Sequence, residues 1–99
     1  MKKLTVIAGD SGVYVGYAEG GATALGADGR MVLYGARHLR RYRVALHTSD
    51  GSASDLAAYG LDESCTSSSA PVLGASVLVG VRRAFDVADA ASASFSVPS

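Results

Sequence analysis

The sequence predicts an α+β fold, a small and mostly antiparallel β-sheet or partly open barrel with two short helices. Three observations support this prediction: short β-branched runs alternate with glycine turns, two segments carry helix-terminus signals, and apolar side chains are mostly small. The chain has 99 residues, of which 48% are hydrophobic, with 12 glycines and no tryptophan. This length suits one domain with one core, so we expect a single domain over residues 1–99 with a loose tail at 97–99.

The N-terminal segment predicts a β-hairpin. Residues 4–8 form a β-branched run, residues 9–12 read Gly-Asp-Ser-Gly, and residues 13–18 alternate as a second strand. Alternation assigns Val13, Val15 and Tyr17 to one face, and Tyr14, Gly16 and Ala18 to the other. Glycine inside a strand is typical of a bulge or a close backbone approach, and we expect one at Gly16.

A basic stretch at residues 30–46, which we name the central ribbon, follows a glycine-rich segment. The ribbon holds five of the nine lysines and arginines and no carboxylate. Alternation predicts a strand through Met31 and Leu33, which share a face, and again after Gly35. The preceding residues, 20–29, predict a flexible hairpin loop or, alternatively, a mobile flap over a ligand.

Two interpretations of the ribbon remain open. Charged side chains suppress aggregation at sheet edges, which would make the ribbon a protected edge strand. Arginine also offers planar bidentate donors to phosphate or carboxylate, and tyrosine can stack on a base, which would make the ribbon a binding face. Under the second interpretation the candidate ligand-binding residues are Tyr14, Tyr34, Arg37, His38, Arg40, Arg41, Tyr42 and Arg43.

The C-terminal half predicts one helix, one buried strand and a second helix. Residues 53–59 form the first helix, with Ser52 as N-cap, Gly60 as the stop, and Leu56 and Tyr59 packing inward. The serine-rich residues 63–70 are expected to be an exposed loop. Residues 72–81 are apolar on both faces and predict a strand inside the sheet, which ends at Arg82 and Arg83. Residues 85–95 have helical character.

Catalytic and metal-binding motifs are not present in the sequence. The turn Gly9-Asp10-Ser11-Gly12 matches the tetrapeptide around a serine-protease nucleophile, but that fold needs about twice this length and a base with its orienting acid. His38 and His47 lie far from any cysteine or carboxylate pair, and Cys65 has no neighbouring base. We therefore predict a protein that is not an enzyme, with no catalytic residues, metal or cofactor.

The charge distribution predicts a partner. Formal net charge is zero, which argues against nucleic-acid binding and offers no general attraction to membranes. Residues 31–49 carry four arginines and no carboxylate, whereas residues 50–63 carry four carboxylates and no lysine or arginine. These two oppositely charged segments, together with a core of small side chains, favour a homo-oligomer. The single cysteine suits a reducing compartment, and the apolar run at residues 4–8 is too short for a signal peptide, so we expect a cytoplasmic protein.

A resemblance covers most of the chain. Residues 11–16 (Ser-Gly-Val-Tyr-Val-Gly), 32–42 (Val-Leu-Tyr-Gly-Ala-Arg-His-Leu-Arg-Arg-Tyr) and 56–61 (Leu-Ala-Ala-Tyr-Gly-Leu) occur in this order. The order and the segments resemble a family of small uncharacterised proteins from tailed bacteriophages. Tyr42 stands where that family tends to carry tryptophan. The resemblance implies a phage accessory protein in the host cytoplasm and supplies no activity.

The basic ribbon and the resemblance to tailed-phage proteins together predict a binding function. We expect a non-enzymatic accessory protein whose ribbon binds an anionic small molecule, for example a cyclic nucleotide signal of host immunity, and so serves counter-defence. The alternative is a protein-interaction module that inhibits a host protein through the same arginines and tyrosines, because these residue types dominate binding hot spots.

Overall fold

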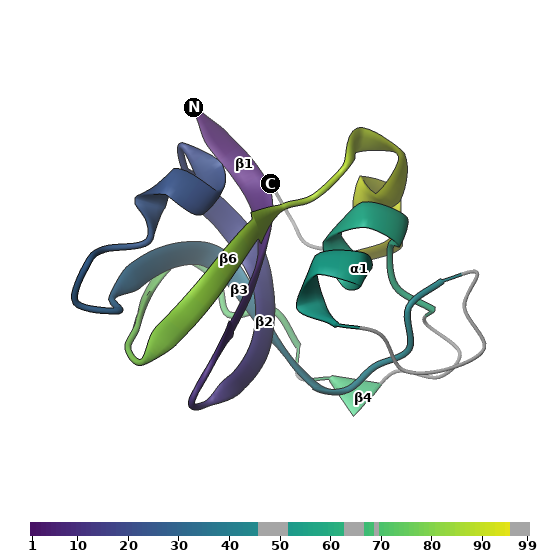
Figure 1. Cartoon of the computed structure of the whole chain (residues 1–99), viewed down its shortest axis with the longest axis horizontal. Coiled ribbons are helices and arrows are strands. Elements are labelled where there is room, and N and C mark those ends of the chain that lie inside the picture. Colours follow the sequence, from purple (N-terminus) through teal and green to yellow (C-terminus); the bar gives the residue numbers. More distant parts are fainter. Residues whose placement is uncertain (46–51, 63–66, 69, 96–99) are drawn as a thin grey trace.

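A computed structural model describes residues 1–45, 52–62, 67–68 and 70–95 and confirms the α+β class. The helices are η1, α1 and η3, of which η1 and η3 are 3₁₀-helices (Figure 1). The elements in chain order are β1 (Lys2–Gly9), β2 (Gly12–Glu19), η1 (Gly21–Ala24), β3 (Met31–Arg41), α1 (Ala53–Tyr59), β4 (Ser67–Ser68), β5 (Ala75–Leu78), β6 (Val81–Asp86) and η3 (Asp89–Phe95).

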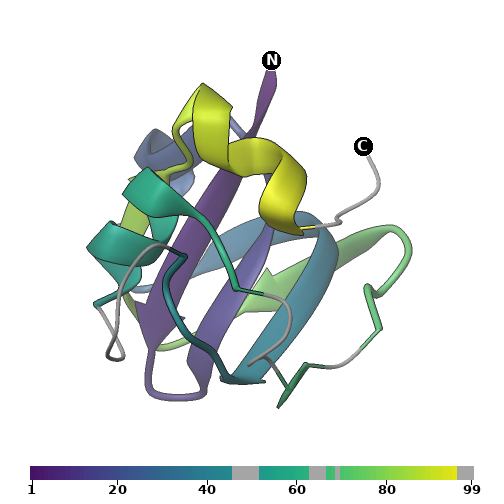
Figure 2. The same ribbon diagram turned by 90° about the vertical axis from the view of Figure 1, so that its right-hand side faces the viewer.

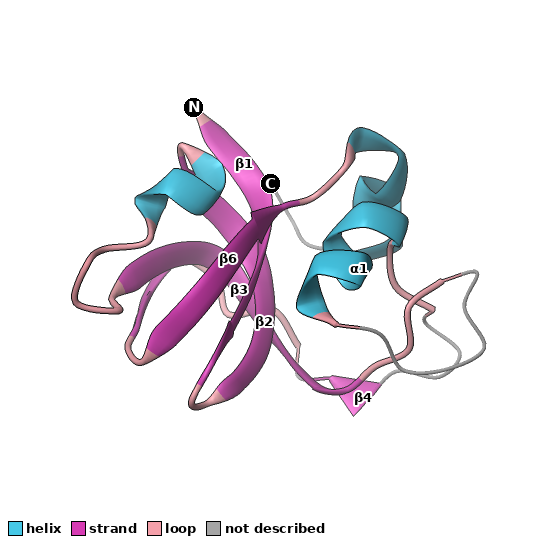
Figure 3. Ribbon diagram, in the orientation of Figure 1, coloured by secondary structure: helices cyan, strands magenta, loops and turns pink. Residues whose placement is uncertain are grey.

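All described strand pairs are antiparallel and form one open sheet. Its order is β4-β3-β2-β1-β6, and β5 pairs with β3 as well. The helices lie on two sides of this sheet: α1 and η3 together on one side, and η1 on the other (Figure 3). A view turned by 90° places α1 and η3 side by side in front of the strands (Figure 2). The partly open barrel stays a prediction.

Two apolar clusters lie on the two faces of the sheet. The first cluster packs β1, β2 and the end of β3 against α1 and η3, and includes Val6, Val15, Leu39, Leu56 and Phe95. The second cluster packs the opposite face of the strands near η1, and includes Ile7, Ala18, Met31, Leu33 and Val81. Both faces of the small sheet are therefore occupied by side chains from this one chain.

The N-terminal hairpin is confirmed, together with its two faces. Gly9 pairs with Gly12 next to the turn, and Val6 pairs with Val15. Val13, Val15 and Tyr17 belong to or pack on the first cluster. Tyr14 and Ala18 belong to or pack on the second.

A β-bulge in β3 confirms the expectation at Gly16. Val15 pairs with Arg37 but Tyr17 pairs with Tyr34, so β3 has one extra residue opposite Gly16. Gly35 allows the chain to accommodate this extra residue, because its φ of 68° lies in the left-handed region. A Cβ on Gly16 would lie 3.1 Å from the Tyr34 carbonyl oxygen, closer than ordinary contact. The bulge reverses the alternation of β3. The odd-numbered Leu33, before the bulge, faces the second cluster, whereas the odd-numbered Leu39, after it, faces the first.

The helix α1 has its predicted limits but not the predicted inward face. The Ser52 hydroxyl accepts a hydrogen bond from the Asp55 backbone N–H at 3.3 Å, and Gly60 ends the helix with a φ of 96°. The buried stripe consists of Ala53, Leu56, Ala57 and Gly60. Tyr59 falls outside this i, i+3, i+4, i+7 pattern and is 51% exposed, so the prediction that it packs inward is wrong.

The prediction of a central strand at residues 72–81 is also wrong. Only residues 75–78 form β5, which among the described strands pairs with β3 alone. The chain turns at Gly80, whose φ is 69°, and continues as β6. Arg82 and Arg83 therefore lie within a strand that pairs with β1, rather than at the end of one.

The second predicted helix begins later than expected. Phe85 pairs with Val6 in the β6–β1 ladder, and the helical segment starts at Asp89 as the 3₁₀-helix η3. Pairing with β1 outweighs the local helical pattern here. Within the loops, residues 21–24 form η1, and Ser67–Ser68 form the two-residue strand β4. His47, Cys65 and the tail at 97–99 lie outside the described residues. Within the described part of the chain, no helix is long and apolar enough to cross a membrane.

Candidate functional site

The central ribbon does not present its candidate residues on one face. Arg37 is only 9% exposed and turns toward the first cluster. Its Nη1 donates a 2.5 Å hydrogen bond to the carbonyl oxygen of Phe95 at the end of η3. This arginine therefore connects the sheet to the helical layer.

His38 and Tyr14 lie on the other face of the sheet. Their rings are stacked, with centroids 4.5 Å apart and planes 16° apart. They are cross-strand neighbours in β3 and β2, and Tyr14 packs on the second cluster. The stacked pair is partly buried and contributes to packing between neighbouring strands.

The other ribbon residues are spread along and beyond β3. Tyr34 lies before the bulge, with the Lys2 ammonium 3.8 Å from its ring centroid. Arg40 and Arg41 are exposed at the end of β3. The Arg43 Nε is buried without a hydrogen-bond partner among the described residues, while its backbone carbonyl accepts from the Asp62 N–H at 2.9 Å.

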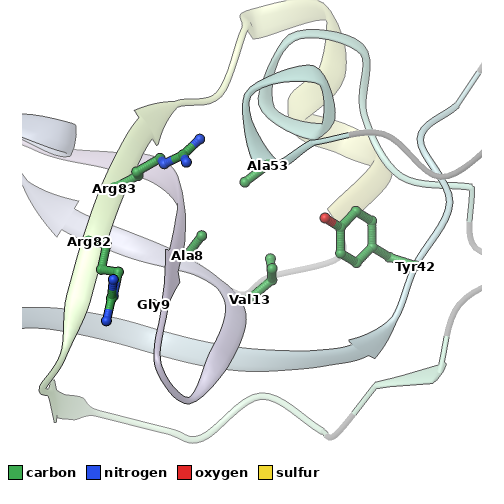
Figure 4. Close-up of a pocket in the computed structure, with 7 residues that line it drawn as sticks. All are labelled: Ala8, Gly9, Val13, Tyr42, Ala53, Arg82 and Arg83. Atoms are coloured by element: carbon green, nitrogen blue, oxygen red, sulfur yellow. The ribbon is translucent and has the colours of Figure 1, made fainter.

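Tyr42 lines a pocket with two arginines that lie outside the ribbon. The pocket has a volume of about 230 Å³. We call it the Arg83 pocket, and it is lined by Ala8, Gly9, Val13, Tyr42, Ala53, Arg82 and Arg83 (Figure 4). Arg83 extends from β6 toward α1, and the Tyr42 side chain faces it from the opposite wall with its hydroxyl turned toward the cavity.

A bulge between β1 and β6 aims the two arginines differently. Ala8 pairs with Arg83 and Gly9 pairs with Val81, so Arg82 is the extra residue. Arg82 Nε is 2.8 Å from Asp10 Oδ1, and both side chains are well exposed, at 75% and 62%. The Arg83 side chain is exposed as well and makes no hydrogen bond or ion pair to any described residue.

The lining residues combine fixed positive charge with a small apolar floor. Two guanidinium groups can donate to phosphate or carboxylate oxygens, and Ala8 and Val13 give a surface for carbon atoms. None of the seven lining residues is a histidine, cysteine or carboxylate. Within the described part of the chain, no group of three histidine, cysteine or acidic side chains is placed to hold a metal ion. The arrangement is suited to holding an anion.

Comparison of the chain with protein-family models, with curated proteins and with solved structures finds no match.

Sequence reasoning missed Arg82 and Arg83 as site residues. It treated the Arg-Arg pair as the end of an apolar strand, because two consecutive charges often follow a buried segment. The pair lies on β6, and strand alternation places Arg83 on the same face as Phe85, which packs on the first cluster beside α1. The bulge that turns Arg82 aside has no signal in the sequence.

Proposed function

We propose that this protein is a non-enzymatic binding protein for a small anionic ligand and that the Arg83 pocket is its binding site. One observation carries the proposal: the exposed Arg83 guanidinium, without a charge partner among the described residues, faces Tyr42 across a cavity of about 230 Å³. Arginine recognises planar oxyanions by paired hydrogen bonds, and tyrosine adds both a hydroxyl and an aromatic surface.

The volume limits the size of the ligand. Pockets for drug-sized ligands usually span roughly 300–1,000 Å³. The Arg83 pocket is smaller and would take one phosphate or carboxylate group with a short carbon portion, such as the phosphate end of a nucleotide. A cyclic dinucleotide would place one phosphate in the pocket and leave its second unit outside.

The biological setting rests on the resemblance to tailed-phage proteins. We propose that the protein acts in the cytoplasm of the host cell, where it sequesters an anionic nucleotide signal of host immunity. This setting follows from the resemblance and from the chemistry of the pocket together. Zero net charge continues to argue against a nucleic-acid ligand.

Isothermal titration calorimetry with pyrophosphate, AMP and a cyclic dinucleotide tests the proposal. Arg83→Gln removes the proposed ligand contact, and Arg41→Gln removes another exposed arginine, one of the ribbon that does not line the pocket. We expect Arg83→Gln to raise the Kd of a bound probe at least tenfold and Arg41→Gln to change it less than twofold. The reverse order would assign binding to the ribbon, and no heat with any of the three probes would refute an anion site.

A second candidate function is supported by Arg40 and Arg41. Both side chains are exposed and adjacent at the end of β3, and arginine is enriched in the hot spots of protein interfaces. The protein would then inhibit a host protein through this surface. Capture from host lysate by wild type and by an Arg40→Glu/Arg41→Glu variant tests this function, and identical captured proteins would contradict it.

We also propose that the sheet curves into a partly open barrel. β5 and β6 lie at its two sides, yet only Val79 and Gly80 separate them in the chain. The Val81 N–H donates to the Gly29 carbonyl at 2.9 Å, which brings the start of β6 close to the residues that lead into β3. Such curvature supports the pocket, because it holds β6 and the end of the ribbon around the same face.

A further inference from the structure

The strand β5 is an edge strand in a segment of the chain that has no charged residue. Residues 70–81 contain no lysine, arginine, aspartate or glutamate. β5 pairs with β3 on one side, and none of the described strands lies on its other side. Sheet edges are normally blunted by charges, proline or bulges, because an unprotected edge pairs with another strand.

The sheet edge at β6 shows the usual protection. This six-residue strand carries Arg82, Arg83 and Asp86, all of them exposed. Asp86 also accepts a 2.7 Å hydrogen bond from the Ala22 N–H, which anchors η1 beside β6. Of the two longer edge strands, β5 and β6, only β5 is free of charged residues, and this contrast points to a specific use for it.

The ladder with β3 fixes which backbone groups of β5 point outward. The Gly35 N–H donates to the Gly74 carbonyl at 3.2 Å, so the pair Gly35–Gly74 is hydrogen-bonded. In an antiparallel ladder the direction of these groups alternates from one residue to the next. Ser76 and Leu78 therefore turn their N–H and C=O groups toward β3, while Ala75 and Val77 turn theirs to the open edge.

Apolar side chains accompany this open edge. Val77 is 65% exposed and lies directly across from Val32, which is 38% exposed. Leu73 and Val79 flank β5 in the chain and are 84% and 60% exposed. With Val72, these residues leave roughly 500 Å² of apolar surface per chain, at the upper end of the largest patch on a typical monomer.

We propose that β5 pairs antiparallel with β5 of a second copy about a twofold axis, so that two sheets join into one. The axis passes beside Ser76, which then faces Ser76 of the second copy in a non-hydrogen-bonded pair. Ala75 pairs with Val77 of the other copy through two hydrogen bonds, and symmetry repeats them. This register uses the N–H and C=O groups of Ala75 and Val77, which point to the open edge.

A second copy fits this edge better than an unrelated chain. Antiparallel pairing about a twofold is self-complementary, and each copy contributes the same uncharged segment, so no charge is buried. Pairing along the edge brings the two apolar patches side by side in one joined sheet and buries only part of each, which predicts a weak, concentration-dependent dimer. The contact closes after two copies, because each chain uses its single β5 edge in the pair.

Disulfide trapping tests the register directly. In a Cys65→Ser background, Ser76→Cys places two thiols on Cα atoms about 4.5 Å apart, within the range of roughly 4.4–6.8 Å that a disulfide spans. We expect oxidation to convert most of this variant to a covalent dimer. Ser54→Cys, at an exposed position of α1, is the matched control and should give at least fivefold less dimer under the same conditions. Equal cross-linking of both variants, or none at Ser76→Cys, would overturn the proposed register.

Solution mass tests the edge without any cysteine. Wild type should show a dimer mass that falls toward 10.0 kDa on dilution. Val77→Lys should raise the dimer dissociation constant at least tenfold, whereas Ala58→Lys adds the same charge on exposed α1 and should leave it unchanged. Circular dichroism confirms that both variants remain folded. A monomer at every concentration, or a dimer that Val77→Lys does not weaken, would refute the proposal, and neither outcome depends on the anion pocket.

Discussion

Arg37 Nη1 donates a hydrogen bond of 2.5 Å to the carbonyl oxygen of Phe95, joining the middle of β3 to the last residue of η3 across 58 positions of the chain. Phe95 is fully buried and Arg37 nearly so. The last carbonyls of a helix have no partner within the helix, and a buried one needs a donor from elsewhere. Arg37 supplies that donor, so it holds the helical layer against the sheet.

Replacing Arg37 with methionine should destabilise the protein. The variant keeps an unbranched side chain of similar length but leaves the Phe95 carbonyl without this donor, which should cost about 2–3 kcal/mol of unfolding free energy. Urea denaturation followed by circular dichroism measures this loss. Arg41→Met is the matched control at an exposed position of the same strand and should stay within about 0.5 kcal/mol of wild type. A loss below that limit in Arg37→Met would contradict the structural role.

The burial of Arg37 could not be predicted from its neighbours in the sequence. Its neighbours give it the same basic context as Arg40 and Arg41, and arginine is mostly exposed in proteins, so the three were grouped in one binding surface. Burial of Arg37 depends on Phe95, which approaches only in the folded chain. The bulge at Gly35 reverses the alternation of β3, so Tyr34 and His38 lie on opposite faces although they are four residues apart.

Gly35→Ala should test the importance of this bulge. A side chain at a φ of 68° costs about 1–2 kcal/mol, and we expect the unfolding free energy to fall by that amount. Thermal and urea unfolding measure the change, and an NMR spectrum shows whether the fold is kept. A variant as stable as wild type would mean that β3 can pair with β2 without glycine at this position.

Gly16→Ala should also destabilise, for a different reason. Its Cβ would lie 3.2 Å from the Leu33 Cβ and 3.3 Å from the Ala36 Cα, so β2 and β3 would have to separate slightly. Overpacking of this kind costs about 1–3 kcal/mol. The same unfolding measurements apply, and an unchanged midpoint would show that the two strands have room to move apart.

Features with a local cause were predicted well from the sequence. The Gly-Asp-Ser-Gly turn, the alternation of residues 13–18 and the limits of α1 each depend on a few neighbouring residues, and all three were confirmed. The apolar run at 72–81 was misplaced, because a run of this kind fits a buried strand and an open edge equally well. Its exposure depends on which strands lie beside it, and the sequence pattern does not specify that.

The N-cap of α1 allows a matched pair of substitutions. Ser52→Ala removes the oxygen that accepts from the Asp55 N–H and should cost about 1 kcal/mol of unfolding free energy. Ser52→Asp keeps an acceptor at the same position and should cost less than half of that. Chemical denaturation of both variants checks this order. Equal losses would indicate that the hydroxyl acts through another contact, such as its 2.8 Å hydrogen bond with the Ser54 hydroxyl.

Removing the charge of Asp10 should strengthen anion binding at the Arg83 pocket. Asp10 Oδ1 lies 2.8 Å from Arg82 Nε, and this carboxylate competes with any anion for that guanidinium. Both side chains are well exposed, so Asp10→Asn should change the unfolding free energy by less than about 0.5 kcal/mol.

The gain in affinity comes from the freed Arg82 and from the loss of one nearby negative charge. We expect pyrophosphate to bind about threefold more tightly to Asp10→Asn at low ionic strength, with a smaller gain as salt screens the pocket. Asp28→Asn is the matched control, because Asp28 pairs with Arg30 at 3.6 Å and does not line the pocket. Calorimetric titration of both variants decides the matter: weaker binding by Asp10→Asn, or an equal gain in both, would show that Arg82 does not take part in holding the anion.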